Sequence, residues 1–244
     1  MHATLTIARR ELAAYFASPL AYVFIVIFLA LAGGLTFSLG AWLERGQADL
    51  QTFFGWHPWL YLFLVPAVGM RLWAEERKTG TIEFLMTQPV TTAQAVLGKF
   101  LAAWLFVTIA LALTFPIWLT VNYLGDPDNG VILAGYFGSW LIAGGMLAIS
   151  AAASALSKNQ VIAFVLAAAI CFLFLMSGLE LVQAFFRVWA PASLVRGIAS
   201  LSLLTSFNTI TQGVIDLRDL IMLGSLIAVS LFINATLIEL KKGS

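Results

Sequence analysis

Long apolar runs alternate with short polar segments along almost the whole chain. A run of about 20 apolar residues lets a helix cross the hydrocarbon core of a bilayer, which is roughly 30 Å thick. The pattern predicts six such spans, at residues 19–43, 58–73, 100–123, 131–156, 159–179 and 218–239. The second run is short and contains Pro66. The chain is therefore predicted to be an all-α polytopic membrane protein.

The residues before the first span repeat at helical spacing and predict an amphipathic helix. Its apolar stripe consists of Leu5, Ala8, Leu12, Tyr15 and Phe16. Such a helix is expected to lie in the membrane interface with Arg9 and Arg10 toward the lipid headgroups. Pro19 would then end this helix and start the first span. A plain extension of the first span is the alternative. The chain is accordingly divided into an interfacial helix, residues 1–18, and a six-helix domain, residues 19–244.

A polar segment over residues 71–99 separates the second span from the third. Within it, residues 81–86 predict a short helix whose apolar face carries Ile82, Leu85 and Met86. An exposed apolar face on a short helix indicates a docking surface. Thr91 and Gln94 have the spacing of a capping box that opens the helix of the third span.

Residues 180–217 contain apolar stretches that are too short to span and are divided by Pro191. They predict short helices at the outer side of the membrane, between the fifth and sixth spans. Asp216 and Asp219 then fit the N-terminal capping positions of the sixth span.

The fourth span carries Gly135, Gly138, Gly144 and Gly145. Small residues let helices approach closely in lipid, which predicts contacts within the chain or, as the alternative, a dimer seam.

Composition and charge agree with the membrane assignment and orient the chain. About 61% of its 244 residues are hydrophobic and about 10% are charged, far outside the range of soluble domains. One side of the membrane receives Arg9, Arg10, Arg71, Arg77, Lys78, Lys99, Lys158, Lys241 and Lys242. The other side receives only Arg45, Arg187, Arg196 and Arg218, together with most of the acidic residues. The positive-inside rule then predicts that both termini are cytoplasmic.

The long apolar stretches of the predicted spans carry Asp, Glu, Lys or Arg only at their ends, whereas Arg71–Lys78 forms a charged run between two of them. Membrane proteins that couple ion movement to work usually carry ionisable groups at mid-membrane depth. An ion-coupled carrier is therefore disfavoured. Energy is expected to enter from outside the membrane, through the charged segment.

Motifs for catalysis and metal binding are missing from the sequence. Gly98-Lys99 is followed by Phe100 and is not a phosphate-binding loop. Cys171 is the only cysteine and is interpreted as a core residue, and His57 as a solvated loop residue. No catalytic activity, cofactor, metal or nucleic-acid partner is expected for this chain itself.

The run Glu75-Glu-Arg-Lys-Thr-Gly-Thr-Ile-Glu-Phe-Leu-Met-Thr-Gln-Pro89 resembles the first cytoplasmic loop of type-two ABC transporter permeases. The run from Phe207 to Asp219 is similar to the stretch that enters the last span in one branch of that family. This branch contains the permeases associated with gliding motility and with nitrous-oxide reductase maturation. The six-span order and the amphipathic start agree, so the resemblance covers essentially the whole chain.

The resemblance implies two permeases, identical or related, each bound to a cytoplasmic ATPase that holds ATP and Mg²⁺. It implies that the ATPase contacts both the inner loop and the amphipathic start, so Arg9, Arg10 and Leu12 belong to the expected interface. It also leaves room for a periplasmic or membrane accessory subunit. The expected coupling residues are Glu75, Glu76, Arg77, Gly80, Thr81, Glu83, Leu85 and Met86.

The function expected from these observations is the permease subunit of an ATP-driven exporter in a bacterial inner membrane. The alternative from another class is a membrane scaffold whose ATPase performs mechanical work on an envelope or motility complex without a transported cargo. An ion-coupled secondary carrier remains the third possibility.

Overall fold

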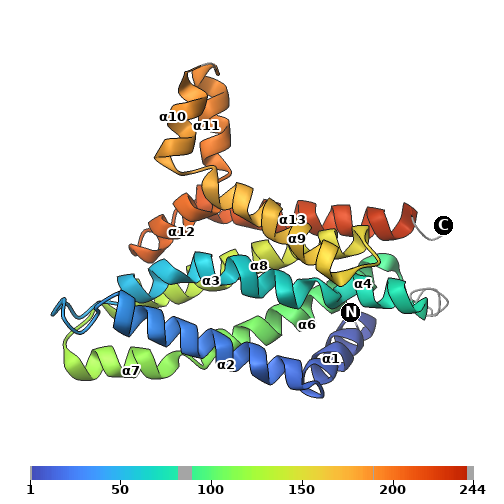
Figure 1. Ribbon diagram of the computed structural model, residues 1–244, viewed down its shortest axis with the longest axis horizontal. Helices are drawn as coiled ribbons and strands as arrows, with labels where there is room; N and C mark the ends of the chain where they lie inside the picture. Colours follow the sequence, from blue (N-terminus) through green and yellow to red (C-terminus); the bar gives the residue numbers. More distant parts are fainter. Residues whose placement is uncertain (1, 82–89, 189, 241–244) are drawn as a thin grey trace.

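The computed structural model describes residues 2–81, 90–188 and 190–240. In these ranges it is a bundle of long helices without β-strands (Figure 1). The predicted all-α polytopic fold is confirmed. The elements of the first half are α1 (His2–Phe16), α2 (Pro19–Gly34), the π-helical turn η1 (Leu35–Leu39), α3 (Gln51–Gly69), α4 (Arg71–Thr79), α6 (Thr92–Ala112) and α7 (Phe115–Leu124). Those of the second half are α8 (Asn129–Leu156), α9 (Gln160–Met176), α10 (Glu180–Arg187), α11 (Ala192–Ser200), α12 (Leu203–Thr211) and α13 (Leu217–Leu240).

Five helical segments in the described ranges are long and apolar enough to cross a bilayer. They are Pro19–Leu39, Gln51–Thr79, Thr92–Leu124, Asn129–Leu156 and Leu217–Leu240. A sixth arises if α9 and α10 count as one span, bent by 76° between them. Only when this bent pair is counted does the number equal the six predicted spans. The second span is longer than predicted, because α3 begins at Gln51 and α4 continues it to Thr79.

Helix α8 lies at the centre of the bundle and contacts α3, α6, α9, α12 and α13. Its small residues make this possible. A Cβ added at Gly135 would lie 2.4 Å from the ring of Phe54 on α3, so only glycine fits at this crossing. A Cβ added at Gly144 would lie 2.8 Å from the indole of Trp104 on α6. These glycines therefore serve contacts within the chain, in agreement with the first of the two readings of the fourth span.

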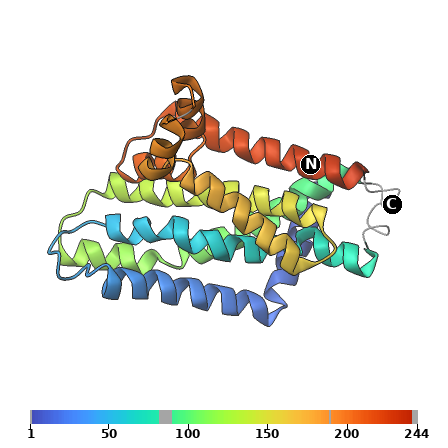
Figure 2. The same ribbon diagram turned by 45° about the horizontal axis from the view of Figure 1, so that its top comes forward.

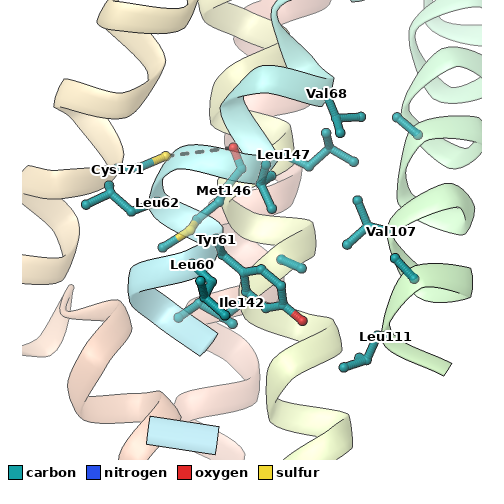
Figure 3. Close-up of a cluster of buried hydrophobic side chains, with 14 of the residues drawn as sticks. Leu60, Tyr61, Leu62, Val68, Val107, Leu111, Ile142, Met146, Leu147 and Cys171 are labelled. Atoms are coloured by element: carbon teal, nitrogen blue, oxygen red, sulfur yellow. Dashed lines mark hydrogen bonds between the residues drawn. The ribbon is translucent and has the colours of Figure 1, made fainter. Parts of the chain in front are cut away.

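The core of the bundle fills the space where α3, α6, α8 and α9 meet (Figure 3). Tyr61 on α3 and Met146 on α8 are almost fully buried there. The thiol of Cys171 on α9 points at the carbonyl oxygen of Met146, 3.8 Å away. Cys171 is itself buried, as its interpretation as a core residue requires.

The interpretation of His57 as a solvated loop residue is wrong. His57 lies inside α3 and is fully buried, with Nδ1 2.7 Å from the hydroxyl oxygen of Ser139 on α8. Phe28 and Phe53 pack against its ring. The sequence did not show this because the aromatic residues around His57 look like an interfacial belt at the end of a loop, whereas α3 already begins six residues earlier, at Gln51.

Different helices lie at the two ends of the bundle. At one end lie α1, α4, the connection from α8 to α9 and the C-terminal end of α13, and this is called the charged end below (Figure 1). Helices α7 and α12 lie toward the other end. Both views show α10 and α11 projecting sideways from the bundle (Figures 1 and 2). Short helices between the last two long ones were predicted from the sequence, and the structure contains three.

Candidate functional site

Helix α4 lies at the charged end and carries three of the expected coupling residues, Glu75, Glu76 and Arg77. It follows α3 directly and ends at Gly80, whose φ of 73° is the left-handed conformation that glycine adopts without strain. Arg77 and Lys78 occupy its last turn, where cations interact favourably with the helix dipole. The charged run is therefore helical over Arg71–Thr79, and the polar segment read from the sequence at residues 71–99 overlaps α4 at its start and α6 at its end.

Lys99 on α6 joins α4 to α1 in the interior of the charged end. Its Nζ lies 2.8 Å from Oε1 of Glu76 on α4 and 3.3 Å from Oε2 of Glu11 on α1. The side chain is only 3% exposed. A buried ammonium is tolerated when carboxylates pair with it. These three residues are called the Lys99 cluster.

The surroundings of Lys99 explain why α1 lies where it does. Its Nζ sits 5.3 Å from the ring centre of Trp73, within reach of a cation–π interaction. One residue earlier, a Cβ added to Gly98 would lie 2.8 Å from the Ile7 side chain, so glycine lets α1 lie directly on α6. Tyr15 stacks on Phe106, with ring centres 5.1 Å apart.

The buried side of α1 differs from the predicted stripe, because α1 packs against α6. Ile7 is buried, whereas Leu5 is exposed. Leu12 packs against the core as the stripe requires, and Arg9 and Arg10 are exposed. Arg10 pairs with Glu11 at 3.1 Å.

A second set of contacts fixes α4 to the end of α8. The hydroxyl oxygen of Ser154 accepts from the backbone N–H groups of Trp73 and Ala74, both at 3.0 Å, and donates to the carbonyl of Met70 at 2.7 Å. It thereby satisfies donors that the first turn of a helix leaves without partners. Arg77 donates to the carbonyl oxygen of Ala155 at 2.6 Å. Helix α4 is thus held by α6 and α1 on one side and by α8 on another.

Two of the remaining expected coupling residues, Glu75 and Thr81, lie within the described ranges. Glu75 is exposed and pairs with Arg71 at 3.2 Å. Thr81 is exposed and its hydroxyl lies 3.0 Å from that of Thr79. Glu83, Leu85 and Met86 fall outside the described residues, as does the predicted short helix that contains them.

Lys99 and Glu11 are the two site residues that sequence reasoning did not select. Lys99 was counted only as an inner-side charge next to the third span. Its spacing to Glu76 and Glu11 follows no local pattern, so only the packing of three separate helices reveals the cluster. Within the described ranges, no three His, Cys, Asp or Glu side chains lie close enough together to bind a metal ion.

The fold and this site define a class, a multi-pass helical membrane subunit with an ion-paired framework at one end. Residues 5–238 match the profile of the ABC-2 family transporter proteins. The chain belongs to this family and is an ABC transporter permease. Family membership implies an ATPase partner, and permeases of this kind are membrane subunits that are generally not catalytic themselves. A search of the curated proteins finds no match.

Proposed function

We propose that this permease works as an exporter in a bacterial inner membrane, with both termini in the cytoplasm and a second copy or a related permease beside it. The distribution of Lys and Arg supports the orientation. The charged end, which contains α1, α4 and Lys158, would face the cytoplasm. The turn with Asp126 and the hairpin of α10 and α11 would face outward.

The ATPase would dock on residues 75–90, called the coupling segment below, with contributions from α1. ATP binding would move this segment, and α4 would transmit the movement to the spans. The Lys99 cluster carries this proposal. One buried cation, Lys99 on α6, pairs with Glu76, where α4 enters the coupling segment, and with Glu11 on α1, so a displacement of α4 reaches α6 and α1. Interior surfaces built from apolar and small side chains suit an apolar or amphipathic cargo.

The isolated chain is expected to hydrolyse no ATP, because its sequence contains no phosphate-binding loop. Hydrolysis should appear when the chain is purified together with a separate ATPase subunit. The measurement is phosphate release by both preparations, with an ATPase-inactive variant of the partner as the control. Sustained hydrolysis by permease free of any ATPase would contradict the assignment.

The proposed orientation predicts which loops react with a membrane-impermeant thiol reagent in whole cells. In a Cys171→Ala background, Asp126→Cys should react from outside, and Lys158→Cys should react only after the membrane is opened. Both positions are exposed and lie in the two connections that flank α8. Labelling of Lys158→Cys in intact cells would overturn the orientation.

A second candidate is a scaffold in the gliding-motility and nitrous-oxide-reductase branch, in which the ATPase drives mechanical work and no cargo crosses. The observation that favours it is the projecting hairpin, where Leu181, Phe185 and Val188 on and beside α10 are exposed. Such a surface suits an accessory subunit. Liposomes containing the permease and its ATPase separate the two candidates. Cargo movement supports export, whereas ATP turnover without cargo movement supports the scaffold.

A further inference from the structure

A cavity lies at the charged end, between α1, the first two turns of α2 and the junction of α3 with α4. Its volume is about 280 Å³, near the lower end of the range for ligand sites. Phe24, Leu64 and Val68 belong to its apolar lining. Its polar side chains include Glu11, Arg71 and Glu75.

The position of the cavity relates it to one leaflet of the bilayer. Along α2 it extends from Leu20 to Ile27, which is about 10 Å at the rise of an α-helix. That depth covers the headgroup boundary and the first part of the acyl chains. Leu20, Val23 and Ile27 are 48%, 51% and 41% exposed, so the wall formed by α2 continues into the apolar surface that faces lipid.

The charges identify the headgroup that fits. Arg71 donates to Glu75 through Nε, and within the described part of the chain its two terminal nitrogens have no hydrogen-bond partner. A guanidinium whose terminal N–H groups are available can bind a phosphate through two hydrogen bonds. Glu11 is already paired with Lys99 and Arg10, whereas Glu75 has only Arg71 beside it and its side chain is 48% exposed. When Arg71 also binds a phosphate, an ammonium group next to that phosphate would complement the carboxylate of Glu75.

We propose that the cavity binds a zwitterionic phospholipid with a primary amine, of the phosphatidylethanolamine class, from the leaflet at the charged end. Arg71 holds the phosphate, Glu75 faces the ammonium, and an acyl chain lies between α2 and α3. The bound lipid fills the angle between α1 and the first span, and so supports α1 next to the Lys99 cluster. This site shares Glu75 with the coupling segment, but lipid binding by the permease alone depends neither on the direction of transport nor on the presence of the ATPase.

The test is photolabelling of the full-length chain in vesicles of phosphatidylcholine that contain a small fraction of a photoreactive phosphatidylethanolamine, with a diazirine in its acyl chain. Labelled peptides should come from α2 and the end of α3. Because charge-assisted hydrogen bonds are the strong ones, Arg71→Gln is expected to lower labelling about tenfold. Val23→Trp places an indole in the mouth of the cavity and should abolish labelling.

Two controls make the result specific. Val229→Trp on α13 introduces the same side chain at another lipid-facing position, 55% exposed, and should leave labelling unchanged. A photoreactive phosphatidylglycerol, which lacks the amine, should label the cavity several-fold less. Equal labelling by both lipids, or labelling that survives both Arg71→Gln and Val23→Trp, would overturn the proposal. Loss of permease pairing in Val23→Trp together with unchanged labelling would assign the cavity to the second copy instead.

Discussion

Lys99→Met is expected to destabilise the permease by about 3 kcal/mol, because removing one partner of a buried ion pair leaves uncompensated charge. In this case two carboxylates, Glu11 and Glu76, would face each other without the cation between them. The melting temperature of the purified protein should fall, and any folded fraction should lose the connection between α4 and α1. The complex would then hydrolyse ATP without transmitting the movement of the ATPase to the spans.

The matched control is Lys158→Met, which removes the same charge from an exposed position and should change the melting temperature little. A rescue makes the test sharper. Adding Glu76→Gln to Lys99→Met removes one of the unpaired carboxylates, so part of the lost stability should return. If Lys99→Met melts at the same temperature as Lys158→Met, the ion-paired framework does not exist as described.

Substitutions in the coupling segment are expected to have the second large effect, this time on the ATPase. Glu83→Lys reverses a flanking charge, and Leu85→Asp removes an apolar anchor. Interface energy concentrates in a few residues, and losing about 2 kcal/mol at one of them weakens binding roughly thirtyfold. Both variants should insert into the membrane normally, but bind the ATPase weakly or hydrolyse ATP without coupled work.

The controls for these two variants are Glu239→Lys and Leu240→Asp, at the end of α13. They make the same chemical changes at exposed positions of the charged end. The measurements are co-purification of the ATPase and coupled activity in liposomes. Normal ATPase binding and normal coupling in both Glu83→Lys and Leu85→Asp would remove the coupling segment from the mechanism.

Features with local causes were predictable from the sequence. Thr91 and Gln94 form the expected capping box in front of α6. Ser18 accepts from the backbone N–H of Leu20 at the start of α2, next to Pro19. Each of these signals involves residues within four positions of one another, so their chemistry could be read directly. Of the two caps expected at the start of α13, one differs. Asp216 accepts from the backbone N–H of Arg218, whereas Asp219 accepts from the side-chain hydroxyl of Ser206 at 2.8 Å.

Features that depend on distant partners were not predictable. His57 is buried because Ser139, far along the chain, provides its hydrogen-bond partner. The α3 helix begins early for a similar reason, since the side chain of Gln51 donates to the carbonyl of Thr211 at 2.6 Å. Lys99 looked like an ordinary charge at the membrane boundary, and its role follows from Glu11 and Glu76. The apolar pattern thus determines the spans, whereas their polar connections emerge only from packing.

Cross-linking in the assembled complex is the sharpest test of contact between the coupling segment and the ATPase. A photoreactive group is attached to Thr81→Cys in a Cys171→Ala background, and the complex is irradiated with and without ATP. Thr81 is exposed next to Gly80, where α4 ends. A cross-link from Thr81→Cys to the ATPase is expected, with a yield that changes with ATP, and none is expected from Asp126→Cys at the opposite end. An intact complex that shows no cross-link from Thr81→Cys, with or without ATP, would contradict contact between the coupling segment and the ATPase.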